Sequence, residues 1–320
     1  MPDLFDLSSM VMDINSELNK ATLFQNLELL AGQVVEGFIS GIHKSPFHGF
    51  SAEFAEHKIY NTGESTKHID WKLFARTDKL YTKRYEEETN LRCHMILDNS
   101  ASMYYPKIKN LSLTSLNKIG FGALAIAALM RLLKKQRDAV GLSVYGETNS
   151  FYAPEKSSER HFQMLLSHLN RLVLETTGEK RTRTYHFLHH IAEKIHRRSL
   201  IFVFSDMFQT EVEEEKLFEA LQHLKYNKHE IVLFHLLDSD LEAQFNFDNT
   251  PKRFIDVETG QHIDLHAENI REAYRAGIEG YLKALKLKCM QYKIRYVEVD
   301  IRSNFSTVLN TFLVERQKFV

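Results

Sequence analysis

Three short oxygen-bearing side chains follow an apolar run at alternate positions. The segment HMILDNSASMYY places Asp98, Ser100 and Ser102 two residues apart, directly where the apolar run stops. Carboxylate and hydroxyl oxygens are ligands for hard cations such as Mg²⁺, which prefers octahedral oxygen coordination and keeps several of its waters. The same residues could instead form an ordinary turn that Asp98 caps, so this stretch alone leaves both interpretations open.

A second apolar run also ends in polar residues. The segment SLIFVFSD finishes with Ser205 and Asp206, and the segment GEKRTRTYHFL offers Thr182 and Thr184 just before a predicted helix. A lone aspartate at the end of a strand usually caps the next turn or helix, here the region EEEKLF. The combination of a D-x-S-x-S run, a T-x-T loop and a later Ser-Asp pair favours one shared cation site over separate caps.

The elements that must position these residues predict an α/β fold. From residue 91 onwards, strands rich in Val, Ile, Leu and Phe alternate with helical segments, and the strands read RCHMILD, AVGLSVYG, SLIFVFSD, EIVLFHLLD and RYVEVDI. Continuous apolar strands separated by helices predict a doubly wound, mainly parallel central sheet with helices on both faces. Ligands of such sheets bind outside the carboxyl ends of the strands. We therefore expect Asp98 and Asp206 at the same edge.

The chain is predicted to comprise a small N-terminal element, residues 1–88, packed on a main α/β domain, residues 89–320. The element begins with a helix whose apolar face carries Leu23, Leu27, Leu30, Val34 and Phe38. It continues as irregular β structure around an NTGES turn. The only tryptophan, Trp71, is expected to be largely buried at the junction between this element and the sheet.

Composition sets limits on the partners and the compartment. Among 320 residues, 41 Lys and Arg nearly balance 42 Asp and Glu, so no overall field attracts nucleic acid or an anionic membrane. The longest uncharged apolar stretch, IGFGALAIAALM, is shorter than the ~20 residues of a membrane span. An acidic start without the basic residues of a signal peptide, and only two cysteines, favour a cytoplasmic protein.

These motifs together resemble a known family. The run D-x-S-x-S, a threonine and a later aspartate resemble the metal-ion-dependent adhesion site of von Willebrand factor A domains. The upstream residues resemble domain-of-unknown-function family 58, whose members are associated with MoxR-type AAA+ ATPases. The matching stretches are Glu53-Phe54, Tyr60 to Glu64, Lys67 to Trp71 with Ala75-Arg76, and Arg197 to Leu200 with Ser205-Asp206. The resemblance covers residues from about 40 to 240 and implies a von Willebrand factor A-like fold.

The resemblance also implies a set of metal ligands and a function. The ligands would be Asp98, Ser100, Ser102, Thr182 and Asp206, with Thr184 as the alternative to Thr182 because GEKRTRT departs from the usual spacing. The cation would be Mg²⁺, or else Mn²⁺ or Ca²⁺. In von Willebrand factor A domains the open metal position is filled by an acidic residue of the partner. The expected protein is a non-enzymatic interaction module that works with a MoxR-type ATPase or with its client.

Two other interpretations were weighed against this one. His186, His189 and His190 have a helical spacing that can bind zinc, but no nearby acid or cysteine completes such a site, which favours a polar helix face. A metal-dependent hydrolase acting on a phosphorylated or acyl substrate is the alternative function. The loop after Asp98 offers no His or Lys as a base, and mostly neutral hydroxyl ligands suit the capture of an outside carboxylate better.

Overall fold

The computed structural model describes residues 27–40, 54–60, 69–85, 91–108, 111–146, 151–174, 184–207, 211–255 and 261–316. The chain divides into two compact units, one of residues 1–42 with 91–320 (the sheet unit) and one of residues 43–90 (the small unit). The N-terminal helix thus belongs to the sheet unit, whereas the sequence groups it with residues 1–88. The predicted packing of that N-terminal element on the main domain stays a prediction.

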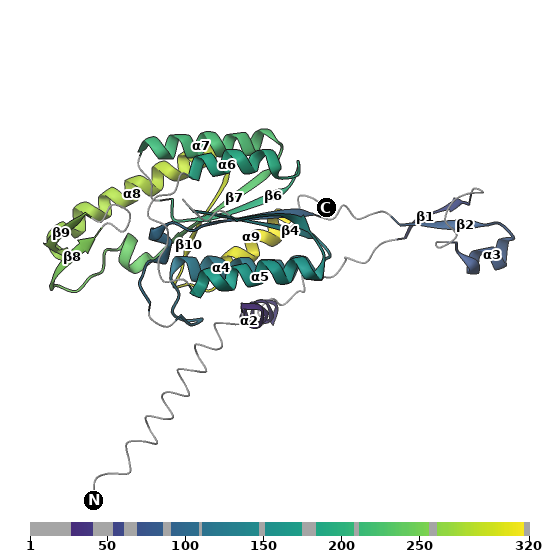
Figure 1. Ribbon diagram of the computed structural model, residues 1–320, viewed down its shortest axis with the longest axis horizontal. Helices are drawn as coiled ribbons and strands as arrows, with labels where there is room; N and C mark the ends of the chain where they lie inside the picture. Colours follow the sequence, from purple (N-terminus) through teal and green to yellow (C-terminus); the bar gives the residue numbers. More distant parts are fainter. Residues whose placement is uncertain are drawn as a thin grey trace, which may run out of the picture. The chain divides into compact units, whose positions relative to one another are not determined.

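A six-stranded sheet forms the centre of the sheet unit (Figure 1). Its strands are β3 (Arg92–Asp98), β4 (Ala139–Tyr145), β5 (Phe151–Lys156), β6 (Leu200–Ser205), β7 (Glu230–Leu237) and β10 (Arg295–Asp300). They lie in the order β10-β7-β6-β3-β4-β5, and only the edge strand β5 runs antiparallel to its neighbour. The inner strands are buried because helices cover both faces, which explains their continuous apolar sequences.

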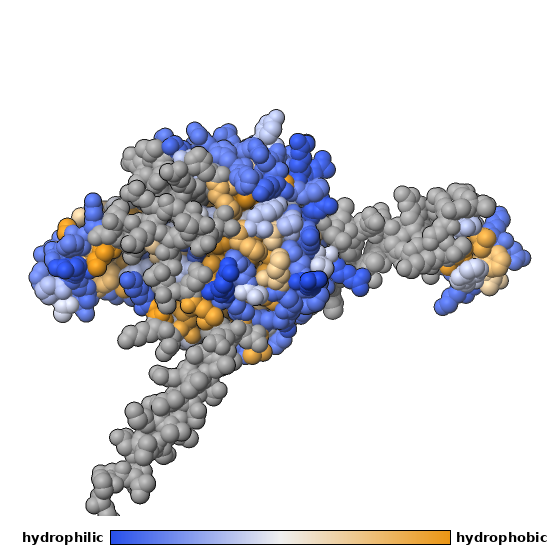
Figure 2. Space-filling view, in the orientation of Figure 1, coloured by the Kyte–Doolittle hydropathy of each residue, from blue (hydrophilic) through white to orange (hydrophobic). Residues whose placement is uncertain are grey.

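Helices lie on the two faces of this sheet (Figure 1). One face carries α4 (Lys118–Lys135), α5 (Glu159–Leu174) and α9 (Ser306–Arg316), with α2 (Leu27–Ser40) packed on α4. The other carries α6 (Thr184–Lys194), α7 (Glu211–Tyr226) and α8 (Ala267–Gln291). Helix α4 is apolar nearly all round because it lies between the sheet and three other helices, whereas the outer surface of α7 is hydrophilic (Figure 2). The predicted α/β class, a doubly wound and mainly parallel sheet with helices on both faces, is confirmed.

Shorter elements follow the carboxyl ends of two strands. A 3₁₀ turn, η2 (Ala101–Tyr104), comes after β3, and a π-helical turn, η3 (Ser239–Ala243), comes after β7. A hairpin of β8 (Pro251–Ile255) and β9 (His262–His266) leads into α8. The ring of Phe245 lies 4.3 Å from that of Tyr274 and 5.3 Å from that of Phe254, which joins η3, the hairpin and α8. No helix in the described ranges is long and apolar enough to cross a membrane.

The small unit pairs β1 (Phe54–Ile59) antiparallel with β2 (Tyr81–Tyr85), and α3 (Trp71–Thr77) lies between them in sequence. Asp70 caps α3 by accepting hydrogen bonds from the backbone N–H groups of Lys72 and Leu73. This cap explains the Ile-Asp-Trp sequence, in which Ile69 is buried and Asp70 begins the helix. Within the small unit Trp71 is 62% exposed, and its ring meets the edge of the Phe74 ring. Its predicted burial at the junction with the sheet stays a prediction.

A buried polar network crosses three strands on one face of the sheet. On β3, the Nδ1 atom of His94 lies 2.6 Å from Oε1 of Glu155 on β5, and its Nε2 atom lies 2.7 Å from Oγ of Ser143 on β4. The ring passes over Gly141, where an added Cβ would lie 2.4 Å from Nδ1. A serine, a histidine and a carboxylate in this order resemble a hydrolase triad. Here Ser143 and His94 are fully buried within strands, so we assign the network to structure.

Replacing Gly141 with alanine is expected to lower the free energy of unfolding by roughly 2 kcal/mol or more. The methyl group would push His94 away from Glu155 and leave buried polar groups without partners. The measurement is urea denaturation. The control is Gly277→Ala in α8, where an added Cβ meets nothing within 4 Å; it should raise the free energy of unfolding by up to about 1 kcal/mol. An unchanged urea midpoint for Gly141→Ala would contradict this account.

Candidate metal-binding site

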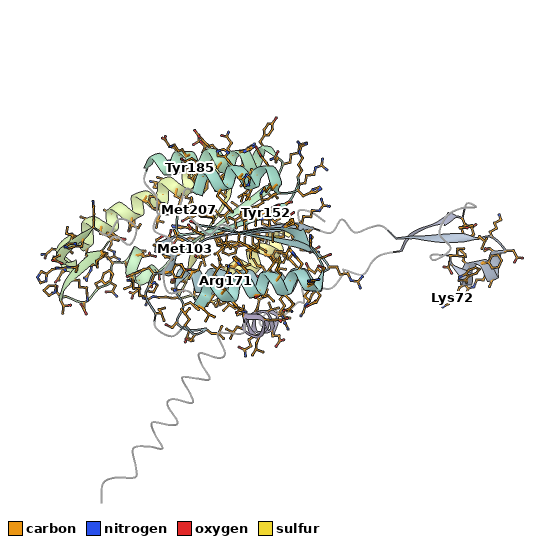
Figure 3. The ribbon with its side chains drawn as sticks, in the orientation of Figure 1. Lys72, Met103, Tyr152, Arg171, Tyr185 and Met207 are labelled. Carbon is orange, nitrogen blue, oxygen red and sulfur yellow. The ribbon has the colours of Figure 1, made fainter. Side chains whose placement is uncertain are left out.

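The ends of β3 and β6 bring two acids to the same edge of the sheet. These strands pair in parallel, with Leu97 opposite Phe204. Asp98 directly follows Leu97, and Asp206 comes shortly after Phe204, so both acids lie at the carboxyl ends of paired strands. Both carboxylates are buried. Met103 and Met207, on the loops that follow the two strands, lie at this same end of the sheet (Figure 3). The shared edge expected from the sequence is thus present.

Asp98 accepts hydrogen bonds on both of its carboxylate oxygens. Its Oδ1 atom accepts from the backbone N–H of Ser100 at 2.9 Å, and its Oδ2 atom accepts from the hydroxyl of Ser205 at 2.6 Å. The hydroxyl of Ser205 in turn accepts from the N–H of Met207 at 3.0 Å. Met207 has a positive φ of 56°, so the chain turns sharply after β6. These contacts fix the orientation of the Asp98 carboxylate.

The alternate spacing of the two serines brings their hydroxyl groups together. The Oγ atoms of Ser100 and Ser102 lie 3.0 Å apart at the start of η2. Asn99, between Asp98 and Ser100, has a separate partner: its Oδ1 atom accepts from the hydroxyl of Tyr104 at 2.8 Å. Within the D-x-S-x-S motif, Asn99 therefore stabilises the turn, whereas Ser100 and Ser102 remain beside Asp98.

Asp206 contacts a lysine that sequence reasoning missed. The Nζ atom of Lys118, the first residue of α4, donates to Oδ2 of Asp206 at 2.7 Å and to Oε1 of Glu242 in η3 at 2.6 Å. The side chain of Lys118 is 0% exposed. The sequence does single out Lys118, because it is a lone charged residue at the start of a long apolar run in α4. Glu242 gave no such signal, because it lies 124 residues from Lys118.

Burial and charge shift the pKa values of this cluster. Burial, and then the charge of Asp206, raise the pKa of Asp98 to about 6, although hydrogen bonds from Ser205 and Ser100 act to lower it. Burial acts to lower the pKa of Lys118, but the charges of Asp206 and Glu242 outweigh it and the pKa is raised. Burial is also the main cause that raises the pKa of Glu242. Negative charge is therefore crowded into a site with little water.

The side chains at this edge fit a hard divalent cation. Carboxylate and hydroxyl oxygens are the donors that Mg²⁺ and Ca²⁺ prefer, and the mutual repulsion of Asp98 and Asp206 is the kind of strain that a cation relieves. Within the described residues, no group of three or more His, Cys, Asp or Glu could hold a metal ion. A site here must therefore use the hydroxyls of Ser100 and Ser102 in addition to the two acids.

The remaining candidate site residues are the predicted threonine ligand and the three histidines of the predicted helix. Thr182 lies outside the described residues, and Thr184 is the first residue of α6, so the threonine ligand stays a prediction. Of the three histidines, His190 is exposed, and Nδ1 of His189 lies 3.2 Å from Nδ1 of His223 on α7. His189 therefore helps to join α6 to α7.

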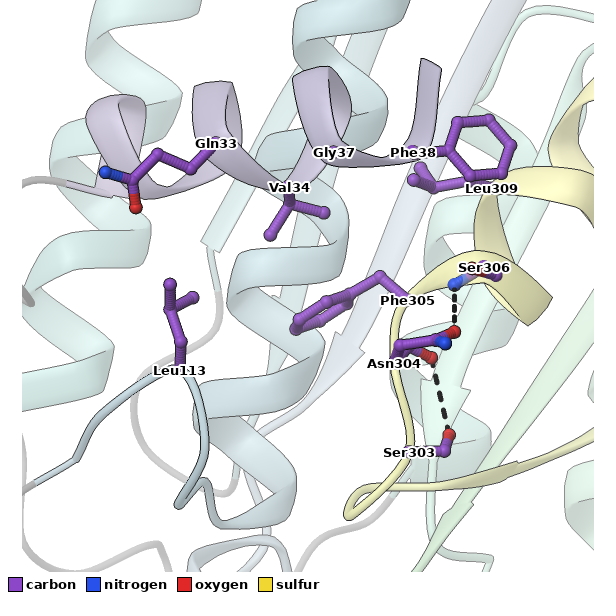
Figure 4. Close-up of a pocket in the computed structure, with 10 residues that line it drawn as sticks. All are labelled: Gln33, Val34, Gly37, Phe38, Leu113, Ser303, Asn304, Phe305, Ser306 and Leu309. Atoms are coloured by element: carbon purple, nitrogen blue, oxygen red, sulfur yellow. Dashed lines mark hydrogen bonds between the residues drawn. The ribbon is translucent and has the colours of Figure 1, made fainter. Parts of the chain in front are cut away.

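A pocket of about 350 Å³ lies between α2, the start of α9 and the turn around Leu113 (Figure 4). Its lining residues are Gln33, Val34, Gly37, Phe38, Leu113, Ser303, Asn304, Phe305, Ser306 and Leu309. The lining has no ionisable side chain. The pocket is therefore unsuited to acid–base chemistry or to metal binding, and the strand ends remain the candidate site.

Solved structures of low sequence identity resemble this chain in part. BatB from Bacteroides thetaiotaomicron is 17% identical, with a TM-score of 0.44 over 72% of this chain and 98% of that chain. An aerotolerance-related membrane protein from Bacteroides fragilis is 15% identical, with a TM-score of 0.45 over 70% of this chain and 99% of that chain.

Curated relatives match a shorter region. The uncharacterized proteins Mb1516 of Mycobacterium bovis and Rv1480 of Mycobacterium tuberculosis are each 28% identical over 83 residues, which is 26% of this chain and 26% of each relative. The matched region thus spans about a quarter of the length of these relatives. The family model described as "Protein of unknown function DUF58" matches residues 56–280. Because this match covers well over half of the chain, the chain belongs to the DUF58 family.

Proposed function

We propose that this chain is a protein-interaction module that presents a divalent cation to an acidic residue of a partner. The proposed ligands are Asp98, Ser100, Ser102, Asp206 and the predicted Thr182. The observation that carries the proposal is the meeting of two buried acids and a pair of serine hydroxyls at the carboxyl ends of β3 and β6. Mg²⁺ is the first candidate, with Mn²⁺ or Ca²⁺ as alternatives.

The composition of the site favours binding to an acidic partner. Two of the four described ligands are neutral hydroxyls, so a bound cation would keep much of its charge and attract an outside carboxylate. A contact of this kind is directional and charge-assisted. The chain's own residues prepare it: Ser205 and the N–H of Ser100 orient Asp98, and Lys118 holds Asp206.

The hydrolase alternative lacks a suitable base among the described residues around the acids. His235 on β7 is buried, and its Nε2 atom lies 2.7 Å from the backbone oxygen of Asp206. Its Nδ1 atom lies 2.7 Å from the hydroxyl of Tyr296, which leaves neither ring nitrogen open to a substrate. Burial also lowers the pKa of His235 to about 4. Lys118 is held by two acids, so it is equally unsuited.

The proposed partner is a MoxR-type AAA+ ATPase or a client of that ATPase, acting in the cytoplasm. This assignment rests on the family resemblance, and the acidic residue that reaches the cation would belong to the partner. In this proposal the chain acts as an adaptor, which has to bind its partner and release it again. A contact made through a cation suits that use, because its strength depends on the ion as well as on the two proteins.

The proposal predicts that partner binding depends on the cation. Capture of a co-expressed MoxR-type ATPase on the immobilised chain should be lost in EDTA and return with excess Mg²⁺. The variant Asp98→Ala should lose capture while keeping its circular dichroism spectrum. The control Asp248→Ala removes an exposed acid that is paired only locally, with Lys252 and Thr250, and should capture normally. Capture that survives EDTA, or Mg²⁺-dependent hydrolysis by the purified chain, would refute the module.

Mg²⁺ alone should stabilise the chain, independently of any partner. A ligand at a hundredfold excess over its Kd stabilises the folded state by about 2.7 kcal/mol, so the thermal midpoint should rise as Mg²⁺ is added. Asp98→Asn keeps the shape of the side chain but removes its charge, and the rise should disappear. Differential scanning fluorimetry measures both. An equal rise in the variant would mean that Mg²⁺ binds elsewhere.

A further inference from the structure

The buried lysine beside the proposed cation site has no role in stabilising its own helix. Lys118 is the first residue of α4, directly after the cap residue Asn117. A positive charge at a helix N-terminus is unfavourable, because the helix dipole has its positive end there. Complete burial of an ammonium group is also costly unless acids compensate it. The position of Lys118 is therefore explained by Asp206 and Glu242, which it contacts, and not by α4.

The second acid on this lysine is held firmly. One oxygen of Glu242 accepts from Lys118 at 2.6 Å, and the other accepts from the backbone N–H of Asp238 at 2.8 Å. Asp238 caps η3 through the N–H groups of Asp240 and Leu241 and is paired with Arg302. Glu242 is thus fixed by the turn that contains it, and it shares the Lys118 ammonium group with Asp206.

We infer that Lys118 sets how tightly the proposed site holds its divalent cation, because its ammonium group competes with the cation for the Asp206 carboxylate. The inference rests on the proposed function. With their usual charges, Asp98, Asp206, Glu242 and Lys118 together carry two negative charges, which one divalent cation balances. Without Lys118 the same cluster would carry three. The lysine therefore weakens the site and keeps the acids paired when no cation is bound.

The two contacts of Lys118 have opposite effects on the cation. The contact with Asp206 opposes cation binding directly, because like charges repel and both draw on the same carboxylate. The contact with Glu242 draws the ammonium group partly away from Asp206. Removing the charge of Lys118 should therefore tighten cation binding, and removing the charge of Glu242 should loosen it. A role for these residues in folding alone predicts no such opposition.

The test is a titration of the full chain with Mn²⁺ alone. Binding is measured by calorimetry and by the electron paramagnetic resonance signal of the free ion. Lys118→Met should lower the Kd for Mn²⁺ at least tenfold, which corresponds to 1.4 kcal/mol. Glu242→Gln should raise it severalfold. The control Lys134→Met removes a lysine of the same helix that is paired with Glu159 on the surface, and its Kd should match that of the wild type.

A double variant keeps the inference testable if a single substitution prevents the chain from folding. Lys118→Met with Glu242→Gln leaves Asp98 and Asp206 as the charged members, so the cluster keeps the two negative charges of the wild type. It should still bind Mn²⁺ more tightly than the wild type, because no ammonium group occupies Asp206. This variant also separates competition for the carboxylate from a simple change in net charge.

The outcomes distinguish this inference from the proposed function. Equal Kd values for the wild type and Lys118→Met would overturn the inference and leave the cation site standing. Absence of Mn²⁺ binding in the wild type, in Lys118→Met and in the double variant would overturn both. The inference would be supported most directly if Lys118→Met and the double variant bound Mn²⁺ measurably while binding by the wild type was weak or undetectable.

Discussion

The parallel pairing of β3 with β6 is the constraint on which the site depends. Because both strands run in the same direction at the centre of the sheet, their carboxyl ends place two acids side by side in a region with little water. Isolated burial of two carboxylates would be strongly unfavourable. The surrounding hydrogen bonds from Ser205 and Ser100, and the ion pairs of Lys118, are the compensation that makes this edge tolerable.

The sheet contains a second polar cluster, which lies earlier along β3 than the strand-end acids. His94, Ser143 and Glu155 connect β3, β4 and the edge strand β5, whereas the acids lie at the carboxyl end of β3. Between them, β3 is apolar and buried. The two clusters differ in one respect that matters for function. The His94 network joins a histidine to a single carboxylate, whereas in the strand-end cluster one lysine is paired with two acids, Asp206 and Glu242.

Sequence reasoning predicts the features that depend on local pattern. The apolar strands predicted the sheet, and the polar residues that end two of them predicted that Asp98 and Asp206 lie at the same edge. It missed features that depend on distant partners. Lys118 meets Asp206 and Glu242 across 88 and 124 residues, and no local pattern encodes that meeting.

The packing of α2 on α4 has a consequence for synthesis of the chain. Helix α2 ends at Ser40 and α4 begins at Lys118, with the whole small unit between them. At about 5–20 residues per second, the apolar face of α2 leaves the ribosome roughly 4–16 s before its partner helix starts to emerge. During that interval Leu27, Leu30, Ala31 and Val35, all buried in the finished protein, have no helix α4 to cover them. Helix α2 thus presents an uncovered apolar face during synthesis until α4 packs against it.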